Sequence, residues 1–205
     1  MAGMTVTQLH NFFAVLALVA IGGAVLMLLA RIIPSVASVR FLAALHKVQL
    51  PLAALVATTA SLGSLYMSEY GNHWAPCRFC WFQRIFMYSS AVVLIMAAVR
   101  RDRGVKWYAV PLASIGILLS GYHIAIERGW VTESTACAAS GPKCSTPYFI
   151  SFGHRDPITL GPAGFPAVTL AVMAFCGFAA ILALLLLPEP LDLTEDESHG
   201  EPAAS

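Results

Sequence analysis

Two pairs of cysteines stand close together in the sequence and outside its long apolar runs. Cys77 and Cys80 form a Cys-x-x-Cys motif, and Cys137 and Cys144 are separated by six residues. Paired thiols can form a disulfide, exchange it with another protein or bind a metal ion. The fifth cysteine, Cys176, lies inside an apolar run, where a free cysteine usually behaves as a small hydrophobic residue. We therefore expect chemistry from the two pairs and none from Cys176.

The elements that carry these cysteines are predicted to be membrane helices. Of the 205 residues, 58% are hydrophobic and only 11% are charged, against about 25% charged in soluble proteins. A helix needs about 20 apolar residues to cross a hydrocarbon core of about 30 Å. Five segments qualify, at approximately 12–33, 48–69, 81–99, 107–126 and 165–187. The sequence thus predicts an all-α integral membrane protein with five spans: a four-helix transmembrane bundle and one extra N-terminal transmembrane helix.

Basic residues predict the orientation in the membrane, because cytoplasmic loops carry an excess of Lys and Arg. They gather at the first and third connections: Arg31, Arg40, Lys47, Arg100, Arg101, Arg103 and Lys106. Both connections are therefore expected in the cytoplasm, which puts the N-terminus outside and the C-terminus inside. Both cysteine pairs then lie on the extracytoplasmic side, where disulfides form and persist.

The first pair precedes the third predicted helix directly. A helix N-terminus favours the reactive thiolate form of a cysteine. Arg84 follows Cys80 by four residues and lies on the same helix face, where it could stabilise a thiolate and polarise a ligand carbonyl. The alternatives are a static disulfide or half of a zinc site for the pair, and a plain interfacial arginine for Arg84. Because a long apolar helix follows the motif, we favour redox use and predict no metal site.

The second pair lies in the long outer loop 127–164, which contains several turn signals. Cys137 and Cys144 can close a small ring, so the alternative to a redox role is a structural loop disulfide. One dithiol at the membrane surface and another on a loop of the same side would form a relay. The loop pair would meet a soluble protein, and Cys77 and Cys80 would meet a lipid-soluble electron acceptor.

A relay of this kind needs an electron acceptor. The sequence has no Cys-x-x-Cys-His haem motif, no Gly-x-Gly-x-x-Gly motif and no iron-sulfur cysteine cluster, which leaves a membrane quinone as the common acceptor. Its ring would fit near Cys80, Trp81 and Arg84, and His123 could help to protonate its oxygens. The alternatives are an aromatic membrane anchor for Trp81 and a packing role for His123. The net charge of +1 gives no basic surface for nucleic acid, so nucleic acid is not expected as a partner.

The residues around the first pair resemble a known family. The stretch 77–88, Cys-Arg-Phe-Cys-Trp-Phe-Gln-Arg-Ile-Phe-Met-Tyr, is similar to the Cys-x-x-Cys-Trp-Tyr-Gln-Arg-Ile signature of bacterial disulfide-bond formation protein B (DsbB), and most of all to its BdbC-like branch. Gly-Tyr-His at 121–123, Pro-Lys-Cys-Ser at 142–145 and the segment 161–166 are also similar. The resemblance covers roughly 45–187.

The resemblance implies a thiol oxidase in the bacterial inner (cytoplasmic) membrane, with ubiquinone or menaquinone as its quinone. Cys77 and Cys80 would reduce the quinone, with Cys80 nearest to it and Arg84 assisting. Cys137 and Cys144 would exchange with a DsbA-like thioredoxin-fold dithiol protein, and Cys137 would form the mixed disulfide.

The resemblance also suggests a division of the chain. Residues 1–44 would form the extra helix and a cytoplasmic connection, 45–187 the DsbB-like domain, and 188–205 an acidic, disordered cytoplasmic tail. One rival interpretation is a quinone reductase like vitamin K epoxide reductase, in which the loop pair usually precedes the Cys-x-x-Cys; the order here is reversed. The other is a non-enzymatic membrane protein with structural disulfides or a zinc site.

Overall fold

The computed structural model describes residues 6–69, 76–133, 142–146, 159–160, 165–166 and 168–188. Its helices are α1 (Val6–Ile32), α2 (Val36–Glu69), α3 (Arg78–Arg100), the 3-10 helix η1 (Arg103–Val105), α4 (Lys106–Glu127) and α6 (Leu170–Leu185). The two-residue strands β1 (Thr159–Leu160) and β2 (Phe165–Pro166) pair antiparallel, with Thr159 opposite Pro166 and Leu160 opposite Phe165. The acidic tail from residue 189 onward lies outside the described residues.

The predicted all-α membrane architecture is confirmed. Four helical segments are long and apolar enough to cross a membrane: Gln8–Ile32, Val36–Glu69, Arg78–Arg100 and Arg103–Glu127. The fifth predicted span, 165–187, contains the 16-residue apolar helix α6, which is shorter than the other four. The chain is therefore a multi-pass membrane protein.

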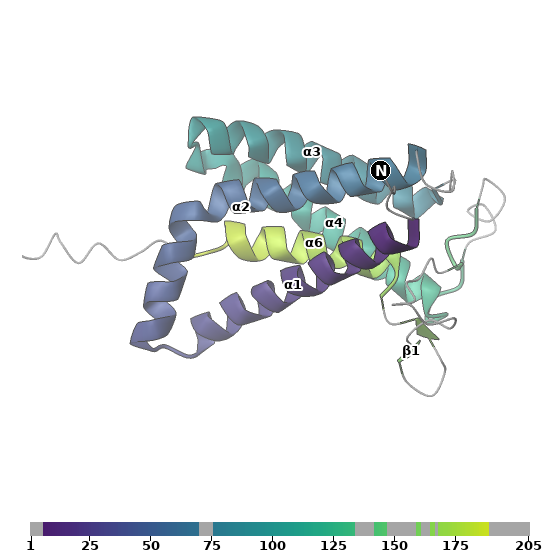
Figure 1. The fold of residues 1–205 in the computed structure, drawn as a ribbon, viewed down its shortest axis with the longest axis horizontal. Coiled ribbons are helices and arrows are strands. Elements are labelled where there is room, and N and C mark those ends of the chain that lie inside the picture. The colour runs from purple at the N-terminus through teal and green to yellow at the C-terminus, as the bar shows by residue number, and fades with distance from the viewer. Residues whose placement is uncertain are drawn as a thin grey trace, which may run out of the picture.

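The helix α2 is longer than predicted and is bent. It begins at Val36, well before the predicted start at 48, and the hydroxyl of Ser35 accepts a hydrogen bond from the backbone N–H of Ser38 at 3.0 Å. Such a cap satisfies a free donor of the first turn. Pro51 lies inside the helix, where it removes a hydrogen bond and clashes with the preceding turn. In Figure 1 the first part of α2 crosses the end of the bundle, and the rest runs along it.

The helices pack around α6, which contacts α1, α2 and α4, while α3 packs against α2 and α4 (Figure 1). Small side chains dominate the contacts, among them the fully buried Ala53, Ala57 and Ala113. This is the usual way for membrane helices to approach closely, because lipid supplies no hydrophobic force between them. A side chain at Gly63 would overlap the ring of Phe13, so this glycine permits the crossing of α1 and α2.

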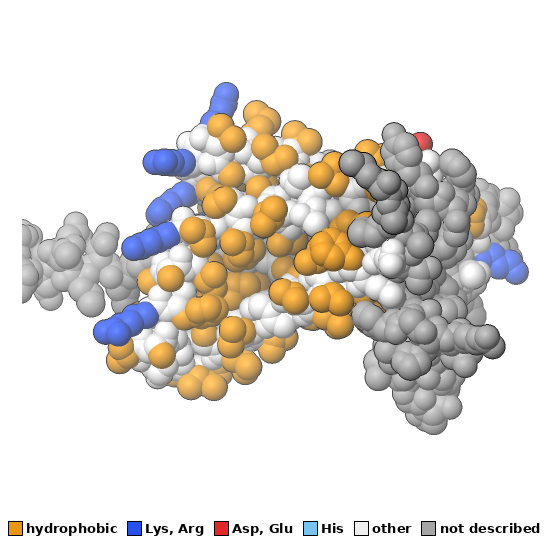
Figure 2. Space-filling model, viewed as in Figure 1, with side chains coloured by type: hydrophobic (Ala, Val, Ile, Leu, Met, Phe, Trp, Pro, Cys, Tyr) orange, Lys and Arg blue, Asp and Glu red, His pale blue; other side chains and the backbone are white. Residues whose placement is uncertain are grey.

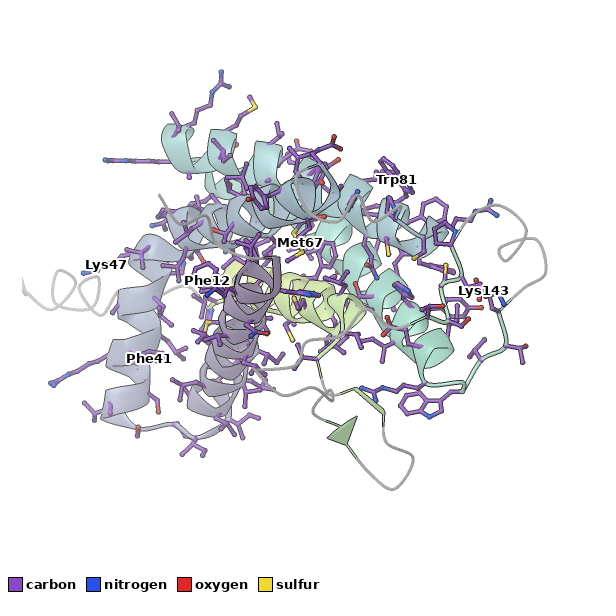
Figure 3. All side chains as sticks on the ribbon, turned by 45° about the vertical axis from the view of Figure 1, so that its right-hand side comes forward. Phe12, Phe41, Lys47, Met67, Trp81 and Lys143 are labelled. Carbon is purple, nitrogen blue, oxygen red and sulfur yellow. The ribbon has the colours of Figure 1, made fainter. Side chains whose placement is uncertain are left out.

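The two ends of the bundle differ in chemistry. Figure 2 shows hydrophobic side chains over the middle of the visible face and a group of Lys and Arg side chains at one end. Lys47 lies at that end, and Lys143, beside Cys144 in the sequence, lies at the opposite end (Figure 3). The helices α3 and α4 connect at the Lys47 end, so the start of α3 and the end of α4 meet at the other.

Candidate active site

Cys77 caps the N-terminus of α3. Its backbone is extended, with φ −65° and ψ 168°, and its Sγ accepts a hydrogen bond from the backbone N–H of Cys80 at 3.3 Å. The first N–H groups of a helix have no partners within it and, together with the helix dipole, they attract negative charge. The structure thus places the Cys-x-x-Cys motif at the start of the third helix, where a thiolate is stabilised.

The two thiols of the motif are within bonding reach but differ in environment. Their Sγ atoms lie 2.7 Å apart. Cys77 is buried, whereas Cys80 is partly exposed. The hydrogen bond with Cys80 and burial raise the pKa of the Cys77 thiol to about 12. In the reduced pair the Cys77 thiol is therefore expected to keep its proton at neutral pH.

Cys144 lies against the same pair. It belongs to the segment 142–146 and is buried beside Cys77 and Ile126. The Sγ atoms of Cys77 and Cys144 and a ring nitrogen of His123 all lie within 4.8 Å of one another. Cys77 is therefore within short reach of both Cys80 and Cys144, which is the arrangement that disulfide exchange between two pairs requires.

His123 joins these thiols to a buried polar network. Its Nε2 lies 3.2 Å from the carbonyl oxygen of Cys144 and 3.7 Å from the Sγ of Cys77, and its Nδ1 lies 3.2 Å from the amide nitrogen of Gln83. A neutral ring with its proton on Nε2 donates to the carbonyl of Cys144 and accepts from Gln83 at Nδ1; a ring with its proton on Nδ1, facing the oxygen of a turned Gln83 amide, leaves Nε2 free to accept a proton from the Cys77 side. The ring also stacks on Phe79. The carbonyl of Cys144, the amide of Gln83 and the ring of Phe79 thus fix the orientation of the imidazole.

Glu127 lies one turn after His123 on α4 and extends the network. Its Oε1 is 3.9 Å from His123 Nε2, and its Oε2 accepts a hydrogen bond from the hydroxyl of Thr169 at 2.7 Å. Thr169 in turn caps α6, where it accepts from the backbone N–H of Val172. A carboxylate beside an imidazole stabilises the imidazolium that forms when the ring accepts a proton. The arrangement can therefore move a proton to or from the buried thiols.

Glu133 holds the Cys144 segment in place and was not singled out from the sequence. Gly129, at φ +70°, turns the chain at the end of α4, which brings Glu133 back over the site. Its Oε1 accepts from the backbone N–H of Cys144 at 2.8 Å, and its Oε2 accepts from the backbone N–H and hydroxyl of Ser145 at 3.3 and 2.9 Å. Although burial acts in the opposite direction, these hydrogen bonds lower the pKa of Glu133. Glu133 precedes Cys144 by eleven residues, and nothing in the sequence indicated that the two would be in contact.

Replacing Glu133 with glutamine should loosen the segment that carries Cys144. Hydrogen bonds to a charged group contribute about 1.5–3 kcal/mol, so alkylation of Cys144 in the folded, reduced protein should be about tenfold faster in Glu133→Gln. Because the pKa of Glu133 is lowered, its anchoring is present at neutral pH and is lost as the pH falls below the usual range of a glutamate. The rate is measured by mass spectrometry across this pH range. Equal rates in wild type and Glu133→Gln would contradict the anchoring role.

Cys80 and Arg84 also border an apolar cavity of about 730 Å³. Arg84 is fixed there by Ser64: its Nε donates to the Ser64 hydroxyl at 3.0 Å, and its Nη2 donates to the Ser64 carbonyl at 3.3 Å. The buried hydroxyl of Tyr88, another lining residue, has no hydrogen-bond partner among the described residues. The cavity therefore combines a thiol and a fixed cation, at Cys80 and Arg84, with the Tyr88 hydroxyl two turns beyond Cys80 along α3, whose hydrogen-bonding capacity is unused among the described residues.

The remaining predicted site residues lie elsewhere. Trp81 is 54% exposed and is not among the residues that line the cavity; its ring lies 5.5 Å from the guanidinium carbon of Arg84, in cation–π contact. His123 lies at the Cys77 and Cys144 side and does not line the cavity either. Cys176 is buried in α6 and free. Cys137 lies outside the described residues.

The donor atoms of Cys77, His123 and Cys144 are close enough together to consider a metal ion. Zinc accepts this set of ligand types and is usually tetrahedral, with Zn–S bonds of about 2.3 Å, which keeps two bound sulfurs about 3.8 Å apart. The 2.7 Å between the sulfurs of Cys77 and Cys80 is well below this separation. Cys80 therefore does not complete a tetrahedral zinc site with Cys77 in this arrangement.

Comparison with known proteins agrees with the geometry. The family model described as disulfide bond formation protein DsbB matches residues 46–188. A probable disulfide formation protein of Deinococcus radiodurans is 40% identical over 141 residues, which cover 68% of this chain and 88% of that protein. Probable disulfide formation protein C 2 of Bacillus cereus is 30% identical over 151 residues, which cover 74% of this chain and 98% of that protein. No solved structure was found to match. The chain belongs to the DsbB family of disulfide bond formation proteins.

Proposed function

We propose that this chain is a quinone-linked thiol oxidase that reoxidises a DsbA-like thioredoxin-fold protein and so sustains disulfide bond formation outside the cytoplasm. The observation that carries the proposal is the position of Cys77 and Cys80. Cys77 lies within reach of Cys144 on the loop side, and Cys80 borders an apolar cavity on the membrane side. A dithiol between a soluble partner and the lipid phase suits the transfer of electrons from one to the other.

The exchange between the two pairs can be written with balanced bonds. After the partner has reduced the loop pair, Cys144 attacks Cys77, so a Cys77–Cys144 bond forms and the Cys77–Cys80 bond breaks. Cys137 then attacks Cys144, which restores the loop disulfide and leaves Cys77 and Cys80 reduced. A ring nitrogen of His123 lies within 4.8 Å of the Sγ atoms of both Cys77 and Cys144; with its proton on Nδ1, the ring could accept the proton of the attacking thiol at Nε2 and return it to the leaving sulfur.

The acceptor proposed for the reduced pair is ubiquinone or menaquinone. A quinone takes up two electrons and two protons, which is what reforming the Cys77–Cys80 disulfide releases. Cys80 would deliver the electrons, the fixed guanidinium of Arg84 would bind a carbonyl oxygen, and the Tyr88 hydroxyl would supply a further hydrogen bond. Trp81 would act through its contact with Arg84.

The proposed orientation follows the charge asymmetry of the bundle. The end that carries Lys47 is rich in Lys and Arg and would face the cytoplasm (Figure 2). The cysteine end would then face the periplasm or the outside of the cell, with the N-terminus on that side and the C-terminus in the cytoplasm. The membrane would be the bacterial inner membrane, where the partner protein and the quinone are both accessible.

The test is anaerobic oxidation of a reduced DsbA-like protein by the purified chain with added quinone. Arg84→Ala should raise the KM for quinone about tenfold, since a hydrogen bond to a charged group is worth about 1.5–3 kcal/mol. Arg78→Ala is the matched control: it removes the same charge beside the same motif, but Arg78 is exposed and does not line the cavity. Its KM should change little. Absence of turnover with any quinone, or equal losses in the two variants, would argue against the proposed acceptor site.

A further inference from the structure

The N-terminal helix α1 precedes the part of the chain that matches the DsbB family model, yet it forms one wall of the cavity at Cys80. Its lining residues include Phe12, Leu16, Ala20, Gly23 and Met27. The opposite side of α1 is exposed to the surroundings of the protein, with Leu18, which does not line the cavity, 48% exposed. The helix thus stands between the cavity and the lipid.

The cavity is long rather than compact. Its lining residues on α1 run from Phe12 to Met27, which corresponds to about 22 Å along a helix that rises 1.5 Å per residue. Phe41, another lining residue, lies at the Lys47 end of the bundle, whereas Trp81, next to the lining residue Cys80, lies toward the opposite end (Figure 3). A quinone ring alone would occupy only one end of such a space.

The cavity also changes in polarity along its length. The thiol of Cys80, the guanidinium of Arg84 and the hydroxyl of Ser64 lie at one end. The rest is lined mainly by aliphatic and aromatic side chains, among them Leu45 and Leu184 at the end farther from the cysteines. A molecule that matches this lining has a polar head beside Cys80 and a long apolar chain.

We propose that α1 encloses the isoprenoid tail of the quinone, so that the tail runs inside the protein between α1, α2 and α6 instead of in the lipid. This inference rests on the proposed function and extends it to the choice of substrate. Contact along the tail makes the protein selective for long-chain lipid quinones over tail-free rings. It also gives the extra helix a role in binding.

Two adjacent glycines of α1 provide the test. Gly23 lines the cavity, whereas Gly22 is exposed and does not, and a Cβ built on either meets no atom within 4 Å. Leucine at either position favours the helix equally, so both variants should fold. Gly23→Leu places four carbons in the path of the tail, and Gly22→Leu places them in lipid. Because a misplaced methylene in an apolar pocket changes selectivity by about tenfold or more, kcat/KM for a long-chain quinone should fall at least about tenfold in Gly23→Leu.

The same Gly23→Leu variant should reduce a tail-free ring quinone at the wild-type rate, and Gly22→Leu should match wild type with both quinones. If wild type turns over quinone but Gly23→Leu shows no tail-dependent loss, or if Gly22→Leu shows the same loss, the enclosing role of α1 is wrong while the proposed function stands. If wild type uses no quinone, both proposals fail.

A binding readout that does not depend on turnover uses a quinone with a photoreactive group at the far end of its tail. Irradiation should label α1, excess long-chain quinone should compete, and Gly23→Leu should reduce the label. A phospholipid with a photoreactive acyl chain serves as the second arm. The inference is overturned if the lipid probe labels α1, if long-chain quinone does not displace that label, and if the quinone probe gives no label that excess quinone removes. Such a result would mean that lipid fills the cavity.

Discussion

Replacing Cys80 with serine is expected to abolish quinone-linked turnover and to leave Cys77 and Cys144 joined by a disulfide. Without Cys80, the sulfur of Cys77 keeps one cysteine partner within 4.8 Å among the described residues, that of Cys144. The Cys77 thiol can then attack Cys144 of the loop disulfide and release Cys137, an exchange that needs no added oxidant. Because Cys77 can no longer pair with Cys80, the Cys77–Cys144 disulfide is removed only by the return attack of Cys137, and it should be populated in the variant. Removing a covalent participant typically lowers turnover by more than about a thousandfold.

The disulfide is identified by peptide mapping under non-reducing conditions, and turnover by the anaerobic quinone assay. Cys176→Ser is the control: this cysteine is also buried and free, but it lies within α6 and outside the cavity lining, so turnover should stay at the wild-type level. Persistent turnover in Cys80→Ser would contradict its place in the relay. Stoichiometric zinc on the wild-type protein, with no Cys77–Cys144 disulfide in the variant, would favour the zinc interpretation.

The membrane helices could be predicted well because their signal is local. About 20 apolar residues in a row leave few alternatives in lipid, and α3 and α4 begin and end within a few residues of the predicted 81–99 and 107–126. The first part of α2 was missed because Arg40, His46 and Lys47 interrupt the apolar pattern there. The residues form a helix all the same, since Ser35 caps it and helix geometry tolerates polar side chains. A hydropathy pattern detects segments apolar enough to cross a membrane, and it does not detect helices as such. The start of α2 at Val36 therefore gave no hydropathy signal in the sequence.

The active site could be predicted only in part, because its geometry depends on contacts between distant segments. The Cys-x-x-Cys motif carries its own helix N-terminus, so its environment could be inferred from the residues that follow it. The contact between Cys144 and Cys77 and the anchoring of Cys144 by Glu133 arise from the turn after α4, which spacing alone does not reveal. The same limit applies to His123. The sequence predicted correctly that it lies in the fourth helix, but it could not predict which groups its side chain would contact. The sequence interpretation placed it near the quinone, and the structure places it beside the thiols.

His123→Ala is expected to slow the exchange between the two cysteine pairs more than the reduction of quinone. The ring is the basic group hydrogen-bonded to both Cys77 and the Cys144 carbonyl, and general acid–base catalysis contributes about 10²–10⁴-fold. We expect a loss of about a hundredfold in the single-turnover oxidation of a reduced thioredoxin-fold protein by the oxidised chain. Reduction of quinone by the pre-reduced chain, followed separately, should change by less than about threefold, because His123 does not line the cavity.

A second substitution separates proton transfer from positioning. His123→Gln keeps a side-chain N–H that can donate to the Cys144 carbonyl, but an amide cannot accept the proton of a thiol. If the ring acts in proton transfer, His123→Gln will keep Cys144 protected from alkylation as in wild type and will still be slow in thiol exchange. Rescue of exchange by glutamine would assign His123 to positioning alone. His46→Ala, which removes a buried histidine of α2 near the Lys47 end, should leave exchange unchanged. A defect confined to quinone reduction in His123→Ala would instead support the quinone-side role inferred from the sequence, and would mean that the contact with Cys77 serves to hold the fold of the site.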